Sequence, residues 1–166
     1  MNNVVPEPDQ IYLQLRNRIL TLKPSEVGLC PSKSAPHVWG VLMDTGYTVG
    51  SATLFSLADG TTSLYYSTGG GMLGSGEYSP VSEASMEFVA QAENHLNHAV
   101  MSNVFPLPEV GQVRFSILTY AGILVCEAPE ITLASGEHLL SPLFQKAQST
   151  VEQLRYLAEK KHTLRP

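Results

Sequence analysis

The sequence predicts a single α+β domain in which a mainly antiparallel sheet packs against helices. Apolar residues at helical spacing mark three segments, and apolar runs of strand length mark five others. These segments follow one another in the order α-βββ-α-ββ-α, and turns rather than long helical crossovers separate the strands of each group. Such short connections favour antiparallel pairing. We therefore expect a two-layer arrangement of a five-stranded sheet and its helices over residues 1–166.

Residues 1–36 are expected to form an N-terminal helix and a linker. Asp9 is of a type that caps helix starts, and Pro24 is of a type that ends helices. Between them, apolar residues recur at helical spacing at Ile11, Leu15, Ile19 and Leu22. The residues that follow, up to 36, are rich in proline and serine, as is typical of a connection.

Residues 37–166 are expected to hold the sheet and two further helices. Asp59-Gly60 predicts a tight hairpin turn, and Ser79-Pro80 and Ser141-Pro142 resemble helix starts. The residues between the first two strands, 44–50, have the composition of a turn. The expected strands are 38–43, 52–57, 62–67, 113–119 and 123–126, with 131–133 as a possible extension, and the expected helices cover 81–100 and 143–158.

Part of the chain echoes itself at an offset of sixty residues. Seven positions between Phe55 and Glu77 are identical to those between Phe115 and Glu137. Two similar strand–loop–helix halves would produce this pattern, and so would chance in a chain rich in serine, glycine and leucine.

The charge distribution excludes several classes of partner. The net charge is −5, and the span from Ser34 to Val113 contains seven acidic residues and no lysine or arginine. Nucleic-acid binding requires clustered basic side chains, so we expect no nucleic-acid partner. The first ten residues do not resemble a secretory signal, and the longest apolar run is too short to span a membrane. We expect a cytoplasmic protein without a membrane partner, whose acidic surface suits a basic partner protein.

A glycine-rich stretch at 68–77 is the first candidate site. Its spacing Gly69-x-Gly71-x-x-Gly74 matches the dinucleotide-binding fingerprint, which places backbone N–H groups against a pyrophosphate. The strands before it, however, do not form a βαβ unit, and no lysine follows it, so a turn or a mobile connection is the favoured interpretation. The candidate ligand-binding residues are Gly69, Gly70, Gly71, Gly74, Gly76, Asp44, Glu77 and Tyr78.

Two shorter motifs suggest chemistry. Asp44-Thr45-Gly46 follows three apolar residues and resembles the aspartic-protease signature, whereas the favoured alternative is a turn between two strands. Glu93, His95 and His98 have a spacing that brings side chains together on a helix. A further ligand is not evident beside the two histidines, so packed or solvated histidines are expected rather than a metal site.

The order of elements, the acidity and the size of the chain resemble those of type III secretion chaperones. That resemblance implies a homodimer that holds an unfolded segment of a partner protein. Profilin-like and roadblock-like modules offer a second structural analogy. We therefore expect a non-enzymatic protein-interaction module, chaperone-like or adaptor-like, without a cofactor. The alternative is a protein that binds a small molecule or peptide, including a hydrolase, through the glycine-rich loop at 69–76 with Asp44 and Glu77.

Overall fold

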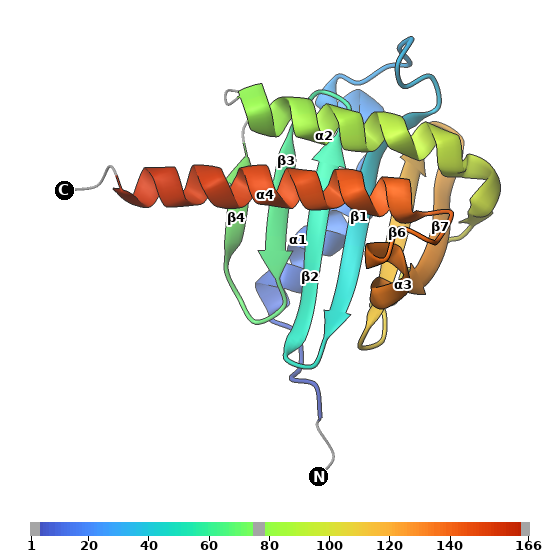
Figure 1. The fold of residues 1–166 in the computed structure, drawn as a ribbon. Coiled ribbons are helices and arrows are strands. Elements are labelled where there is room, and N and C mark those ends of the chain that lie inside the picture. The colour runs from blue at the N-terminus through green and yellow to red at the C-terminus, as the bar shows by residue number, and fades with distance from the viewer. Residues whose placement is uncertain (1–3, 75–78, 164–166) are drawn as a thin grey trace.

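The computed structural model describes residues 4–74 and 79–163. They form an α+β fold in which helices pack on an antiparallel sheet, as predicted (Figure 1). The strands are β1 (Val38–Tyr47), β2 (Gly50–Leu57), β3 (Thr62–Tyr66), β4 (Gly71–Gly74), β5 (Val100–Met101), β6 (Gln112–Thr119) and β7 (Gly122–Pro129). The α-helices are α1 (Gln10–Thr21), α2 (Ser79–Ala92), α3 (Glu130–Ala134) and α4 (Ser141–Thr163), with 3₁₀ turns η1 (Pro24–Val27) and η2 (Glu93–His98).

The sheet has seven strands in the order β4-β3-β2-β1-β6-β7-β5, with every neighbouring pair antiparallel. The prediction of five strands was wrong because both short edge strands carry weak sequence signals. β4 is built from the glycine-rich stretch, which was expected to be a loop. β5 contains Val100, which continues the helical apolar pattern of the preceding segment and was therefore assigned to that helix.

Helices cover both faces of the sheet, so the molecule has three layers rather than the expected two. α2 and α4 cross the strands on one face, and α1 lies on the other (Figure 1). The central strand explains this arrangement, because its side chains alternate between the two faces. Val41 and Met43 belong to the core beneath α2 and α4, whereas Leu42 packs in the smaller core beneath α1. A strand that is apolar on both faces requires cover on both faces.

Two local predictions were wrong for identifiable reasons. The helix expected over 81–100 ends at Ala92, and the chain tightens into η2. That turn contains two asparagines and two histidines, which have low helix propensity. Residues 131–133 lie in α3 rather than in a strand. This short helix starts directly after Pro129, and Glu130 in its first turn complements the positive end of the helix.

The echo at an offset of sixty does not correspond to two similar structural halves. Phe55 packs in the core beneath α1, whereas Phe115 packs in the core beneath α2 and α4. Leu73 lies in β4, whereas Leu133 lies in α3. Positions that match in sequence therefore face opposite sides of the sheet or occupy different kinds of element.

The start of α1 and the β2–β3 turn agree with the sequence predictions. Asp9 caps α1, since its Oδ1 accepts hydrogen bonds from the backbone N–H groups of Ile11 at 2.8 Å and Tyr12 at 3.3 Å. At the turn, the backbone N–H of Thr61 donates to Asp59 at 2.9 Å. Gly60 takes a φ of 93°, which favours glycine.

Candidate functional site

The glycine-rich stretch forms a hairpin turn and an edge strand. Gly69 and Gly70 have φ values of 105° and 78° and make the turn between β3 and β4. The backbone N–H of Tyr66 donates to the carbonyl of Gly70 at 3.1 Å and closes the turn. Because a strand follows this turn directly, the glycines do not present N–H groups at a helix start, and the dinucleotide-binding interpretation fails. Gly76, Glu77 and Tyr78 lie outside the described residues.

Gly71 has a steric role in positioning an aromatic side chain. It pairs across the ladder with Tyr65. A Cβ atom at position 71 would lie 2.4 Å from the carbonyl oxygen of Leu64 and 3.1 Å from the ring of Tyr65. The absence of a side chain therefore lets the Tyr65 ring lie close against β4.

Asp44 is a buried ion-pair partner rather than a turn residue or an exposed catalytic acid. β1 continues past Asp44 to Tyr47, so the turn predicted at 44–50 is confined to the two residues before β2. The side chain of Asp44 is fully buried, and Arg16 of α1 binds both of its oxygens, through Nε at 3.1 Å and Nη2 at 2.8 Å. Thr53 adds a third hydrogen bond at 2.5 Å. The carboxylate is neutralised and fully engaged, which argues against the aspartic-protease interpretation.

The Arg16–Asp44 pair also connects α1 to the rest of the chain. Nη1 of Arg16 donates to the carbonyl of Phe105 at 2.9 Å, in the segment that leads to β6. Tyr12 is 2% exposed, and its hydroxyl lies 2.7 Å from Thr53 Oγ1. Burial is the main cause that raises the pKa of Tyr12 to about 12. The hydrogen bonds of Arg16 and Tyr12 therefore have a structural role, because they hold α1 against the sheet.

The three residues considered for a metal site do not converge. Glu93 accepts hydrogen bonds from the backbone N–H groups of His37 at 2.6 Å and Val38 at 2.7 Å, and so serves the start of β1. His95 is buried, and its Nε2 lies 3.1 Å from the amide of Gln91. Burial, with the neighbouring His98, lowers the pKa of His95. Within residues 4–74 and 79–163, no group of three metal-ligating side chains is present.

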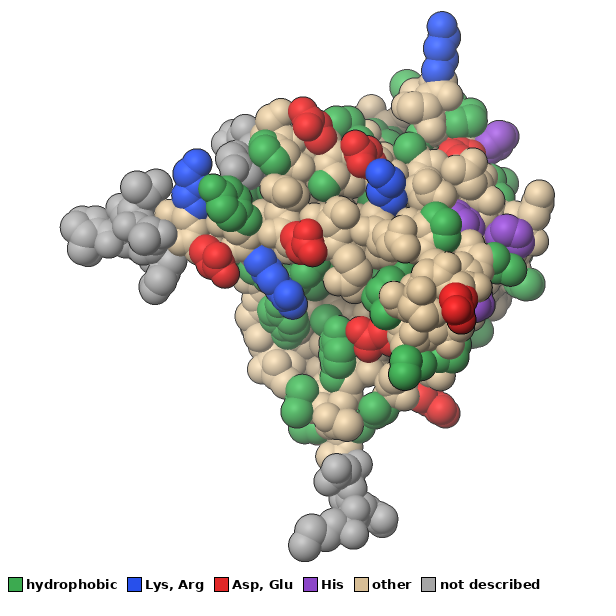
Figure 2. Space-filling view, viewed as in Figure 1, with side chains coloured by type: hydrophobic (Ala, Val, Ile, Leu, Met, Phe, Trp, Pro, Cys, Tyr) green, Lys and Arg blue, Asp and Glu red, His purple; other side chains and the backbone are tan. Residues whose placement is uncertain are grey.

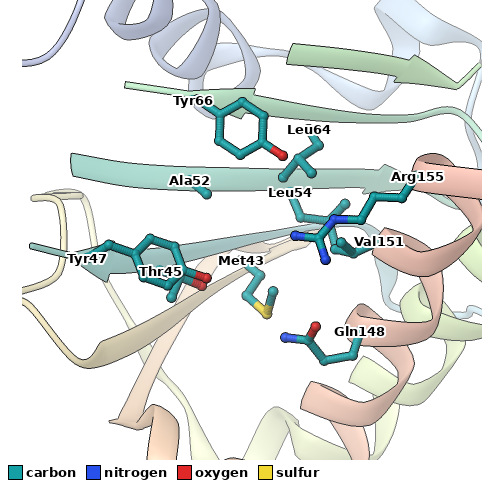
Figure 3. Close-up of a pocket in the computed structure, with 10 residues that line it drawn as sticks. All are labelled: Met43, Thr45, Tyr47, Ala52, Leu54, Leu64, Tyr66, Gln148, Val151 and Arg155. Atoms are coloured by element: carbon teal, nitrogen blue, oxygen red, sulfur yellow. The ribbon is translucent and has the colours of Figure 1, made fainter. Parts of the chain in front are cut away.

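A cleft between the sheet and α4 is the site with the most convergent chemistry. It has a volume of 130 Å³ and is hereafter called the sheet cleft (Figure 3). Its lining consists of Met43, Thr45 and Tyr47 from β1, Ala52 and Leu54 from β2, Leu64 and Tyr66 from β3, and Gln148, Val151 and Arg155 from α4. Alternation along the strands brings every second side chain to this face, and the α4 residues share one side of their helix.

The sheet cleft has an apolar floor and a polar rim. Met43, Leu54 and Leu64 are almost completely buried and form the floor. Two phenols, a threonine hydroxyl and an amide surround this floor, and the Arg155 guanidinium extends from α4 over it (Figure 3). Such a combination of apolar surface and a few polar groups is typical of binding sites.

Arg155 is the one cation of the sheet cleft, and no carboxylate of the described residues lies within ion-pair distance of it. Burial raises the pKa of Tyr47, and the charge of Glu130 adds to this effect, whereas Thr45 and Arg155 oppose it. The phenol is therefore neutral at neutral pH and serves as a hydrogen-bonding group. The cleft presents a positive charge that an acidic group of a ligand could neutralise.

Sequence reasoning did not identify the sheet cleft. Its residues come from four separate segments, and none of them is among the candidate ligand-binding residues named from the sequence. The available sequence signal was the helical spacing of Gln148, Val151 and Arg155. This spacing does not distinguish a binding site from ordinary packing until the register of the strands is known.

Comparison with known proteins found no match for this chain. It matches no protein family, no curated protein and no solved structure. Among the described helices, none has both the length and the apolar character needed to cross a bilayer.

Proposed function

We propose that this domain is a non-enzymatic protein-interaction module that holds a short segment of a partner protein in the sheet cleft. One apolar side chain of that segment lies on the floor of the cleft, and an adjacent acidic group pairs with Arg155. The observation that carries this proposal is a guanidinium above an apolar floor, with no carboxylate of the described residues within ion-pair distance of it.

The volume of the sheet cleft favours a single side chain over a whole small molecule. Sites for small molecules usually measure about 300–1,000 Å³. The cleft measures 130 Å³, close to the roughly 150 Å³ of an engineered cavity that admits benzene. An isobutyl or benzyl group fits such a space, as expected for the anchor residue of a bound peptide.

The charge of the site favours an acidic group beside that anchor. A guanidinium pairs well with carboxylates because its donors match their geometry. The overall acidity of the chain had instead suggested a basic partner. Among the described residues that line the sheet cleft, Arg155 carries the charge, whereas Glu130 acts on Tyr47 from outside the lining. Screening by salt weakens more distant charges further.

Selection from a random peptide library tests this function. Peptides selected on the wild-type domain should be enriched in a leucine or phenylalanine next to an aspartate or glutamate. They should lose binding to Ala52→Phe, because the added ring fills the floor. Peptides that bind wild type and Ala52→Phe equally would contradict the proposal, provided that circular dichroism shows both proteins folded.

A matched pair of fragments isolates the role of Arg155. Isocaproate and its neutral amide have the same isobutyl group and differ in charge. NMR titration should show tighter binding of the acid, and Arg155→Gln should remove this preference. Arg18→Gln, an exposed change on α1, serves as the control and should preserve it. An unchanged preference in Arg155→Gln would exclude this residue from recognition.

Homodimer formation stays a prediction from the resemblance to secretion chaperones. Light scattering on the purified domain measures it directly. If a dimer forms and Ala52→Phe dissociates it, the occupant of the sheet cleft is a second copy of this chain rather than another protein.

A further inference from the structure

We infer that the domain has a second binding site, for a small organic cation with a methylated ammonium group, on the opposite face of β3. The site is a groove between α1 and the β3–β4 hairpin, hereafter called the hairpin groove. Asp9, Ile11 and Tyr12 line it from α1, and Tyr65 and Gly69–Gly71 line it from the hairpin. This inference does not depend on the function proposed for the sheet cleft.

The two walls of the hairpin groove are held together by the backbone. The N–H of Asp9 donates to the carbonyl of Ser67 at 2.7 Å, which ties the start of α1 to the turn after β3. A Cβ atom at Gly69 or Gly70 would have no neighbour within 4 Å, so the space above these glycines is open. The groove is therefore a feature of the folded chain with a defined position for each wall.

The ring of Tyr65 gives the hairpin groove a face that attracts a cation, whereas Tyr12 is 2% exposed and forms the base of the groove. Tyr65 lies against Gly71, which has no side chain to displace its ring. Tyr12 is held by its hydroxyl: the one proton of Thr53 is donated to Asp44, so Tyr12 must donate its own proton to Thr53. The faces of aromatic rings attract cations, and methylated ammonium groups are typical ligands of aromatic sites.

The charge of the hairpin groove has the matching sign. Of the described residues that line it, Asp9 alone is charged. Its Oδ1 caps α1, whereas its Oδ2 makes no hydrogen bond within the described chain. Arg16, beneath Tyr12, is neutralised by Asp44 and does not oppose a bound cation.

The size of the hairpin groove suits a free small molecule. Its volume is 310 Å³, which lies at the lower end of the range for small-molecule sites, whereas the sheet cleft is less than half as large. A choline-sized cation fits this space against the ring of Tyr65. We therefore commit to a free small cation rather than to a methylated side chain of a protein.

NMR titrations with choline and with its carbon isostere test the inference. The isostere has a tert-butyl group in place of the trimethylammonium group, so the two ligands have the same shape and differ in charge. Choline should shift the amide signals of Gly69–Gly71 saturably and bind more tightly than the isostere. Tyr65→Leu should weaken binding about threefold to tenfold, and Tyr65→Phe should retain it, since the ring supplies the attraction.

Asp9→Asn removes the negative charge of the hairpin groove without removing the cap of α1. Asparagine caps helices as well as aspartate does, so α1 should stay intact while choline binding weakens, most strongly at low salt. Equal binding of choline and its isostere would overturn the inference, as would binding that is unchanged in both Tyr65→Leu and Asp9→Asn. Preference for a trimethyllysine peptide over choline would overturn the assignment to a free small molecule.

Discussion

Arg16 and Asp44 form a buried ion pair joined by two hydrogen bonds between the guanidinium and the carboxylate. Both side chains are almost excluded from solvent, at 8% and 0% exposure. Removing one partner of such a pair leaves an uncompensated charge in the interior, which costs about 3–5 kcal/mol.

Arg16→Met should therefore lower the free energy of unfolding by about 3 kcal/mol, as measured by urea denaturation. Adding Asp44→Leu removes the orphaned carboxylate, so the double variant should lose less than the sum of the two single changes. Arg18→Met, on the exposed side of α1, is the control and should have little effect. Additive losses would show that the two side chains are not coupled.

Tyr12 should make the stability of the fold sensitive to alkaline pH. Its pKa is raised from 10.0 to about 12, mainly by burial, so between these values the unfolded chain releases the phenol proton while the folded chain keeps it. The stabilisation is complete below pH 10 and is lost as the pH rises through the folded pKa. Tyr12→Phe should unfold in urea with a weaker dependence on pH above about 10 than the wild type. Tyr156→Phe, an exposed change, should keep the wild-type dependence.

In the β3–β4 hairpin, the neighbouring residues Gly70 and Gly71 are required to be glycine for different reasons. Gly70 has a left-handed φ but open space around it, whereas Gly71 faces the backbone of β3. The first position needs glycine for its dihedral angle, and the second needs it for close approach.

Gly71→Ala should cost more stability than Gly70→Ala. At position 71 the new methyl meets the carbonyl oxygen of Leu64, which cannot move without opening the ladder, so we expect a loss of about 2 kcal/mol or more. At position 70 the strain of about 1–2 kcal/mol is partly offset by the lower entropy of the unfolded chain. Thermal unfolding of the two variants measures the difference. An equal loss would mean that β4 relaxes around the added methyl.

In the folded molecule, acidic residues of the central span lie next to basic residues from the two ends of the chain, although these charges are separated in the sequence. Two acidic residues of the central span pair with basic residues from the ends of the chain: Asp44 with Arg16, and Glu87 with Lys146 at 2.9 Å. On the face that bears α2 and α4, acidic and basic side chains are interspersed (Figure 2). The net charge therefore does not describe the field at a particular site, as Arg155 shows at the sheet cleft, where no carboxylate of residues 4–74 and 79–163 forms an ion pair with it.

The two cores should unfold together because they share one sheet. Trp39 is the only tryptophan of the chain, and it lies in the core beneath α1, with its indole N–H donating to the carbonyl of Thr119 at 3.2 Å. Urea unfolding followed by Trp39 fluorescence and by circular dichroism should give coincident transitions. In Arg16→Met the fluorescence transition should come first, since α1 loses its buried attachment. Separate transitions in the wild type would show that the α1 layer is an independent unit.

The sequence by itself determined the α+β class, the antiparallel pairing, the cap at Asp9 and the hairpin at Asp59-Gly60, because these depend on local patterns and short connections. Only the tertiary structure decided the role of Asp44, since its partner Arg16 lies 28 residues away on another element. The edge strands and the sheet cleft could also be identified only from the tertiary structure. A glycine-rich strand has no apolar alternation to reveal it, and a cleft lined from four elements exists only once strand register brings their side chains to one face.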